Sequence, residues 1–224
     1  MKLVYPEFDI ILDMETDKVN VLTSENRKLF ANLLGDLHEQ VLGGEGEFIL
    51  SEGCKPINMS KVADIIFNPY SVDLNDRKIQ TRLYKEIADI ANTNMFKEQG
   101  DINEVLTDYV EKLIQLVPYN LDYSADICVS DLLKLYGVKL LPYGSGFLDR
   151  ILSYIKIMHQ LAGIKLFIFV NLKQYFEEND LSELYKECAY ENVNLLIVEG
   201  EETAPIEGEN HWIIDKDLCI IRDE

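Results

Sequence analysis

Residues 165–171, KLFIFVN, constrain the fold of this chain more than any other segment. Five consecutive apolar residues stand between a lysine and an asparagine, which is the pattern of a strand covered on both faces in a largely parallel sheet. A similar apolar run, NLLIVEG, follows at residues 194–200, after a segment with helical spacing. Alternating helices and apolar strands predict an α/β domain in which helices pack against a layered sheet.

The middle of the chain has a different pattern. Two long amphipathic helices are predicted there, joined by a short connection at residues 97–100. Their inward stripes comprise Ile79, Leu83, Ile87 and Ile90 in the first helix, and Ile102, Val105, Tyr109 and Leu113 in the second. We therefore predict a discontinuous α/β head domain, residues 1–70 and 121–224, and an inserted antiparallel helical leg, residues 71–120.

Local patterns predict several further elements of the head. Residues 2–5, 8–12 and 19–23 are predicted to be short strands, and Ser24 is predicted to cap the helix that follows them. VKLL, residues 138–141, is predicted to be a strand after a short helix. WIID and LCIIRD, near the C-terminus, are predicted to form a hairpin.

The charge of the chain is large and uneven. Its 40 acidic and 21 basic residues give a net charge of −19, which argues against nucleic acid as a partner if the charge is evenly spread. Residues 132–176, however, contain six basic residues and one acid, Asp149, so this stretch carries +5 and the remainder −24. Either the bases form one cationic surface on an acidic body, or they flank buried strands and pair with acids elsewhere. The six are Lys134, Lys139, Arg150, Lys156, Lys165 and Lys173.

Motifs for catalysis are missing. The phosphate-binding pattern GxxxxGK[ST] needs the dipeptide Gly-Lys, which does not occur in the sequence. Asn171 stands where a nucleotide hydrolase usually carries an acid that helps to hold magnesium. The three histidines form neither an HExxH motif nor a helical pair. We predict that the protein is not an enzyme.

The cysteines and the apolar runs bear on the compartment. Cys54, Cys128, Cys188 and Cys219 are widely spaced without a CxxC pair, which favours reduced thiols over disulfides or a zinc site. The N-terminal residues lack the pattern of a signal peptide, and no apolar run is long enough to span a membrane. We therefore expect a cytoplasmic protein.

The acidic residues are compatible with one kind of metal site. Oxygen ligands suit calcium, which accepts several carboxylate and carbonyl oxygens in flexible geometry. No DxDxDG loop is present, and a solvated acidic face explains the same spacing. The residues concerned are Asp101, Glu104, Asp108 and Glu111 on one helical face, with Asp122 and Asp126 in NLDYSAD.

Three segments together resemble a known family: VLTSENRKLFANLLGDLHE, LDYSADICVSDLLKLYGVKLL, and KLFIFVNLKQYFEENDLSELYKECAYENVNLLIVEG. They are similar to the short form of the type II-A CRISPR-associated family that acts in spacer acquisition, the ring-forming binder of double-stranded DNA ends. The resemblance implies a head related to P-loop and ABC-type ATPases, with no working nucleotide site, and a helical leg. It also implies a homotetrameric ring with a positively lined channel, bound calcium, and partnership with the CRISPR integrase and the RNA-guided effector nuclease.

The resemblance also implies site residues. The family places calcium ligands near the junction of leg and head, which corresponds here to Asp122 and Asp126, assisted by Asp131 or Glu111. For DNA we expect phosphate contacts without base reading, and hence sequence-independent, salt-sensitive binding. The expected DNA contacts are Lys134, Lys139 and Lys156, with Arg77, Lys78, Arg82 and Lys85 of the leg as a second group.

Two other functions remain compatible with the sequence. The chain could be an acidic interaction scaffold whose leg docks protein partners, or a degenerate regulator that binds a nucleotide without hydrolysing it. The first predicts no DNA binding, and the second predicts saturable ATP binding despite the missing loop.

Overall fold

The computed structural model describes residues 1–14, 18–53 and 55–223. Cys54 lies outside these residues. The chain divides into two compact units, one formed by Met1–Leu74 with Pro142–Glu224 and the other by Asn75–Leu141. We call the first unit the head and the second unit the leg. The leg predicted from sequence spans residues 71–120, whereas the compact unit continues to Leu141, because α5 (Val129–Leu135) packs against α3 (Arg77–Asn94).

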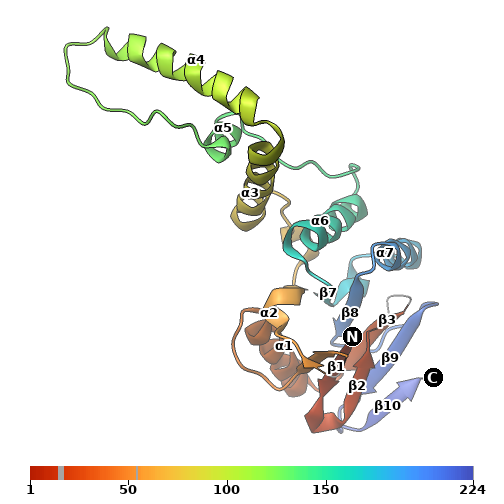
Figure 1. The fold of residues 1–224 in the computed structure, drawn as a ribbon. Coiled ribbons are helices and arrows are strands. Elements are labelled where there is room, and N and C mark those ends of the chain that lie inside the picture. Colours follow the sequence, from red (N-terminus) through yellow and green to blue (C-terminus); the bar gives the residue numbers. More distant parts are fainter. Residues whose placement is uncertain (15–17, 54, 224) are drawn as a thin grey trace. The chain divides into compact units, whose positions relative to one another are not determined.

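A six-stranded sheet forms the centre of the head (Figure 1). Its order is β10-β9-β3-β8-β7-β6, and all neighbours are parallel except β10 and β9, which form the predicted C-terminal hairpin. Every residue of β7 and β8 is buried, so the prediction for KLFIFVN and NLLIVEG is confirmed. The strands are β3 (Val19–Ser24), β6 (Ala63–Ile66), β7 (Leu166–Val170), β8 (Asn194–Glu199), β9 (Glu209–Ile214) and β10 (Ile220–Asp223).

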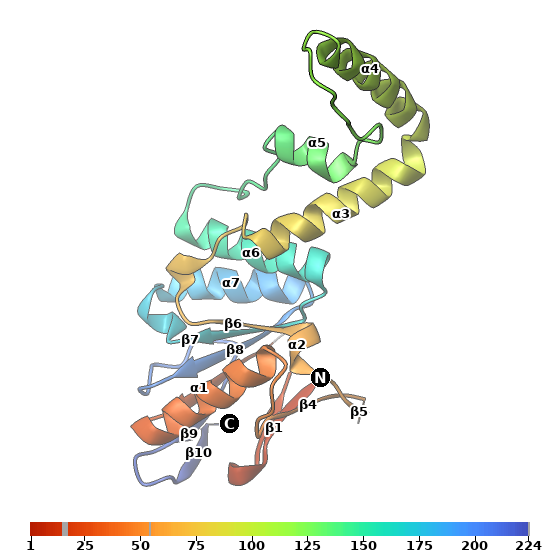
Figure 2. The same ribbon diagram turned by 90° about the vertical axis from the view of Figure 1, so that its left-hand side faces the viewer.

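Helices cover both faces of this sheet, as Figure 2 shows. One face packs against α1 (Arg27–Val41) and the short α2 (Met59–Val62), and the other against α6 (Phe147–Ala162) and α7 (Glu178–Tyr190). Alternate side chains of β7 enter different cores: Leu166 and Ile168 join the first, Phe167 and Phe169 the second. The mixed α/β architecture is therefore confirmed.

A smaller antiparallel sheet packs on the α1 side of the head. Its order is β2-β1-β4-β5, with β1 (Lys2–Tyr5), β2 (Ile10–Asp13), β4 (Ile49–Glu52) and β5 (Lys55–Pro56). Three short 3-10 helices complete the head: η1 (Pro6–Phe8), η2 (Pro69–Ser71) and η3 (Leu172–Gln174).

Helix α1 of the head begins later than predicted. Asn26, not Ser24, is the N-cap of α1, because its side-chain oxygen accepts hydrogen bonds from the amides of Lys28 and Leu29, both at 3.1 Å. Ser24 is the last residue of β3 and is buried.

A segment of the leg that was predicted to be a strand is bonded by a polar side chain instead. Residues 138–141 form no strand, because the Asn75 side chain bonds both backbone groups of Leu140, at 2.8 and 3.0 Å. The hydroxyl of Tyr84 donates to the carbonyl of Val138 at 2.7 Å. The segment therefore runs alongside α3, held by side chains and not by a strand ladder.

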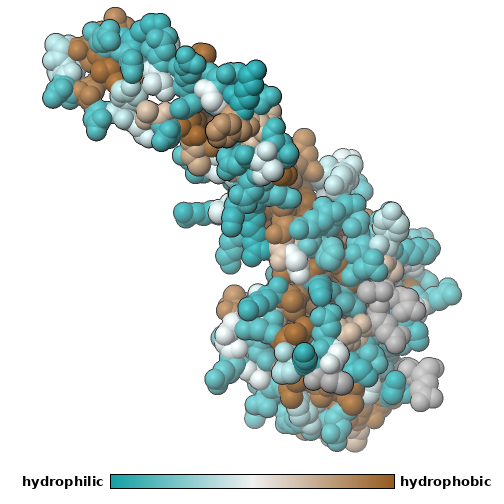
Figure 3. Space-filling model, in the orientation of Figure 1, coloured by the Kyte–Doolittle hydropathy of each residue, from teal (hydrophilic) through white to brown (hydrophobic). Residues whose placement is uncertain are grey.

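The leg helices also differ from the prediction. α3 ends at Asn94 and α4 (Phe96–Ile114) begins after a single residue, so residues 97–100 are helical and do not connect two helices. Tyr84 and Ala91 are buried on α3, while Ile90 is exposed. α4 has no buried residue, and its predicted inward stripe is exposed. Figure 3 shows apolar side chains at the surface of the leg. None of the described helices is both long and apolar enough to cross a membrane.

Candidate nucleic-acid interface

Helix α3 presents the clearest group of basic side chains. The side chain of Asp76 caps the helix by accepting from the amide of Lys78 at 2.7 Å. The spacing i, i+4, i+7 puts Lys78, Arg82 and Lys85 on one face of the helix. All three are exposed, as is Arg77 in the first turn, and none of the four forms an ion pair with a described residue.

Lys139 lies beside the same helix. It stands between Val138, which is bonded to Tyr84, and Leu140, which is bonded to Asn75. Its side chain is exposed and has no ion-pair partner in the described part of the chain. The structure thus brings Lys139 to the N-terminal half of α3, and sequence spacing did not predict this proximity.

Lys134 is already paired. Its Nζ lies 2.8 Å from a carboxylate oxygen of Asp131, one turn earlier on α5, and both side chains are well exposed. The hydrogen bond to Asp131 raises the pKa of Lys134. A phosphate would have to compete with this carboxylate.

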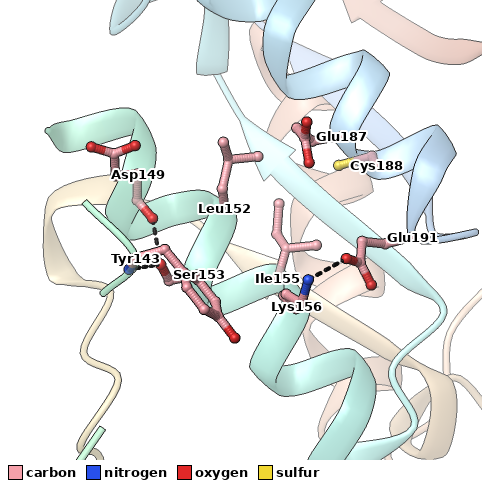
Figure 4. Close-up of a pocket in the computed structure, with 9 residues that line it drawn as sticks. All are labelled: Tyr143, Asp149, Leu152, Ser153, Ile155, Lys156, Glu187, Cys188 and Glu191. Carbon is pink, nitrogen blue, oxygen red and sulfur yellow. Dashed lines mark hydrogen bonds and ion pairs between the residues drawn. The ribbon is translucent and has the colours of Figure 1, made fainter. Parts of the chain in front are cut away.

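Lys156 belongs to the head and borders a cavity of about 180 Å³ between α6 and α7 (Figure 4). Its Nζ lies 2.6 Å from Glu191 and 5.5 Å from the centre of the Tyr143 ring. Glu187 and Asp149 also line the cavity, so carboxylates outnumber Lys156 there. Lys156 was predicted to contact DNA. Its ammonium group would have to leave Glu191 before it could bind a phosphate.

Two other lysines of the predicted cationic stretch are structural. Lys165 pairs with Glu52 at the surface, at 3.3 Å. The side chain of Lys173 is 6% exposed and lies 2.7 Å from the fully buried carboxylate of Glu209. Four of the six bases in residues 132–176 are thus paired with acids, as the second interpretation of this stretch predicted.

Glu209 is the centre of a buried polar network. It accepts hydrogen bonds from Lys173, from His211 at 2.7 Å and from the Tyr185 hydroxyl at 2.6 Å. Burial alone would raise the pKa of Glu209, but the bonds from His211, Lys173 and Tyr185 hold it below its ordinary value. Burial raises the pKa of the neighbouring Glu199. This network stabilises the head and is not an open site.

The predicted calcium ligands do not converge in the folded chain. A carboxylate oxygen of Glu111 accepts from the hydroxyl of Tyr123 at 2.6 Å, and Asp131 is paired with Lys134. Asp122 bonds the amide of Tyr123, and Asp126 is exposed in the same irregular segment. Among the residues that the structure describes, no group of three or more His, Cys, Asp or Glu side chains could hold a metal ion. The residues as arranged here do not fit a calcium site.

The end of β3 is unlike a phosphate-binding loop. The Asn26 side chain occupies the first free amides of α1, which in such a loop point toward phosphate. A cavity of about 350 Å³ beside it is lined by the acids Glu25, Glu201 and Glu202 and the bases Arg27 and Lys216. The acids outnumber the bases in this lining by one.

Comparison with known proteins decides the family. A sequence profile of the family described as "CRISPR-associated protein (Cas_Csn2)" matches residues 40–218, which include the entire leg. The chain belongs to this family.

Two curated relatives agree with the profile over nearly their whole lengths. A protein of Enterococcus faecalis named "CRISPR-associated protein Csn2" is 25% identical over 214 residues, which cover 92% of this chain and 93% of the relative. A protein of the same name from Streptococcus agalactiae is 20% identical over 230 residues, covering 99% of this chain and 97% of the relative. The resemblance stated from the sequence is thereby confirmed.

Sequence reasoning missed one basic residue with an unusual environment. Arg150 was counted in the cationic stretch but not among the DNA contacts. Unlike its four paired neighbours in that stretch, it forms no ion pair with any residue in the described ranges.

Proposed function

We propose that this protein is a non-catalytic, sequence-independent binder of double-stranded DNA ends that acts in CRISPR spacer acquisition. The observation that carries the proposal is the group of five exposed cations without ion pairs on and beside the first half of α3, on a chain with net charge −19. Charges of this kind neutralise phosphates without reading bases. The group consists of Arg77, Lys78, Arg82, Lys85 and Lys139.

A ring reconciles these cations with the acidic chain. A single copy with net charge −19 is repelled by DNA over most of its surface. In a closed homotetramer the cations can face a central channel while most acids face outward. The exposed apolar stripe of α4 supports assembly, because an exposed row of apolar side chains is typical of an interface between subunits.

The head serves this function as a scaffold related to P-loop and ABC-type ATPases, without nucleotide. A parallel sheet whose central β3 leads directly into α1 supports the relationship. The Asn26 cap and the acidic cavity beside it support a head that binds no nucleotide. We propose partnership with the CRISPR integrase and the RNA-guided effector nuclease on the basis of the family alone.

Calcium is part of this proposal only for the assembled form. Asp122 and Asp126 lie in an exposed irregular segment, so a modest rearrangement can bring their oxygens together with backbone carbonyls. Chelator should then change the assembly or its DNA affinity, and Asp122→Ala with Asp126→Ala should remove that sensitivity.

The decisive test compares a linear duplex with the same sequence as a covalently closed circle, over a salt series and with calcium or chelator. We expect binding to the linear form alone. Replacing Lys78, Arg82 and Lys85 with alanine should flatten the plot of log affinity against log salt by about 0.9 for each phosphate that is no longer neutralised. A control variant removes the same charge from exposed head lysines, Lys28, Lys61 and Lys186, and should leave the slope unchanged.

An acidic interaction scaffold is the second candidate, and the exposed stripe of α4 favours it. It predicts no binding to either DNA form under any condition. A monomer that is indifferent to calcium, as measured by light scattering, would favour the scaffold over the ring.

A further inference from the structure

A third cavity in the head lies at the start of α6, apart from the cavity beside Lys156 and from the acidic cavity at the end of β3. Its volume is about 320 Å³, at the small end of the range for ligand sites. One charged residue, Arg150, contributes to its lining. The other lining residues that matter here are Tyr70, Gly144, Ser145, Gly146 and Phe147.

Arg150 in this cavity has unsatisfied donors. Its Nε is buried and has no hydrogen-bond partner in the described part of the chain. One terminal nitrogen makes a single long contact, 3.5 Å, with the carbonyl of Tyr70, and the guanidinium stacks 5.3 Å from the centre of the Phe147 ring. The guanidinium has no carboxylate partner among the described residues, and phosphate matches its planar donors.

Aromatic rings form another part of the lining. Tyr70 and Phe147 stack with ring centres 4.2 Å apart and planes within 15°, and Phe147 stacks in turn on Phe176 at 5.0 Å. The Tyr70 side chain remains 61% exposed, so a further flat ring can join the column. Stacking on an exposed aromatic ring is how proteins hold an unpaired base without reading its identity.

The loop before α6 packs closely against the Asp149 carboxylate. A Cβ at Gly144 would lie 2.1 Å from a carboxylate oxygen of Asp149, so a larger residue there would displace this carboxylate. That carboxylate accepts from the amide of Gly146 at 2.8 Å. Asp149 also lines the neighbouring cavity (Figure 4). Asp149 is the acid directly adjacent to Arg150 in sequence, and its engagement with Gly146 leaves the guanidinium unpaired.

We propose that this cavity binds the terminal nucleotide of a DNA strand, with Arg150 contacting its phosphate and Tyr70 stacking on its unpaired base. The volume fits one nucleotide unit and not a dinucleotide. The choice of a DNA strand as the source rests on the function proposed above, whereas the phosphate and base contacts rest on the cavity itself. The end of a captured fragment would thus be held by the head, separately from the phosphates along the leg.

The test uses the full-length protein and hairpin duplexes with one open end. The open end carries either a 5′-phosphate or a 5′-hydroxyl on one unpaired nucleotide, and affinity is measured by fluorescence anisotropy. We expect about tenfold tighter binding of the phosphorylated end, as a charge-assisted contact provides. This comparison needs only the wild-type protein, so it does not depend on the folding of a variant.

Variants then test whether Arg150 and Tyr70 cause the preference for the phosphorylated end. Arg150→Gln should abolish it, whereas Arg27→Gln, which removes an exposed arginine elsewhere in the head, should preserve it. Tyr70→Ala should weaken binding of the unpaired end, whereas Tyr190→Ala, at an exposed tyrosine on α7, should not. No preference in the wild type, or a preference that survives Arg150→Gln, would overturn the proposal while leaving the duplex binding of the leg intact.

Deoxyadenosine monophosphate and inorganic phosphate, titrated by calorimetry, separate the possible sources. If no duplex binds but the mononucleotide binds in an Arg150-dependent manner, then DNA as the source and the proposed function both fail. If inorganic phosphate binds as tightly as the mononucleotide, the stacking role of Tyr70 is overturned.

Discussion

Strand β7 and helix α4 have equally clear apolar patterns in the sequence, but their side chains lie in opposite environments in the structure. All five residues of β7 are buried, whereas no residue of α4 is. In both cases the apolar spacing correctly indicates the element. Only for β7 does the spacing also indicate that the side chains are buried within the same chain, because an unbroken apolar run needs cover on both faces of the strand. The apolar stripe of a helix can instead be covered by another copy of the chain.

Truncation of one side chain in each element should give the largest contrast. Phe167→Ala, at a fully buried position of β7, should lower the free energy of unfolding by about 3–5 kcal/mol, because it leaves a cavity. Val105→Ala, at a position of α4 that is 67% exposed, should change it by less than about 0.5 kcal/mol in dilute protein. Guanidinium denaturation measures both. A large, concentration-dependent loss for Val105→Ala would instead show that α4 is buried in an assembly.

A buried and an exposed ion pair of the head should differ in the same way. Glu209→Gln should destabilise the head by about 3 kcal/mol, because it leaves buried Lys173 without its carboxylate. Glu52→Gln, which breaks the exposed pair with Lys165, should cost at most about 1 kcal/mol.

The pH dependence of the Glu209 variant provides a second readout. Since the folded pKa of Glu209 is lowered, its stabilising contribution is present above the unfolded carboxyl pKa, about 4.3, and is lost as the pH falls through the folded value. The difference between wild type and Glu209→Gln should therefore shrink in acid. Equal losses for Glu209→Gln and Glu52→Gln at neutral pH would contradict this account.

A charge on the stripe of α4 should affect association and not folding. Val105→Asp should weaken self-association by about tenfold or more, because it places a carboxylate in an apolar contact. Light scattering across a concentration series measures the change. Leu42→Asp, at an exposed apolar residue of the head, provides the control. Equal association for both variants would exclude α4 as the interface.

Glu199 should give the smallest effect. Its folded pKa is raised by burial, so its charged form is disfavoured in the head, and this cost grows as the pH rises above the unfolded carboxyl pKa. Glu199→Gln keeps an oxygen for the amide of Lys173 and should slightly increase stability at pH 8 but not at pH 4. Denaturation midpoints at the two pH values test this, and a loss of stability at pH 8 would show that the ionised carboxylate is needed.

Short-range patterns predicted most of the head. Apolar runs identified β7 and β8, and the segments WIID and LCIIRD identified the C-terminal hairpin of β9 and β10. These features depend on residues close together in the chain, and therefore on information that a single sequence contains.

Features that depend on distant partners could not be predicted. The partner of Lys156 is 35 residues away and that of Lys173 is 36 residues away, so the cationic stretch looked open in sequence although most of it is neutralised. The expected strand at residues 138–141 failed for the same reason, because Asn75 lies 65 residues from Leu140. In the candidate interface, α3 was predicted from its spacing, whereas the addition of Lys139 and the isolation of Arg150 required the fold.

The contact between Asn75 and Leu140 has a consequence for how the gene for such a protein can change. These residues begin and nearly end the leg, so one side chain fastens the two ends of a long excursion of the chain to each other. The entropic cost of closing such an insertion grows only slowly with its length, by about 0.6 kcal/mol for each doubling. Excision of residues 75–141, with a short bridge in their place, should leave a head that still folds, and legs from relatives should be exchangeable as cassettes.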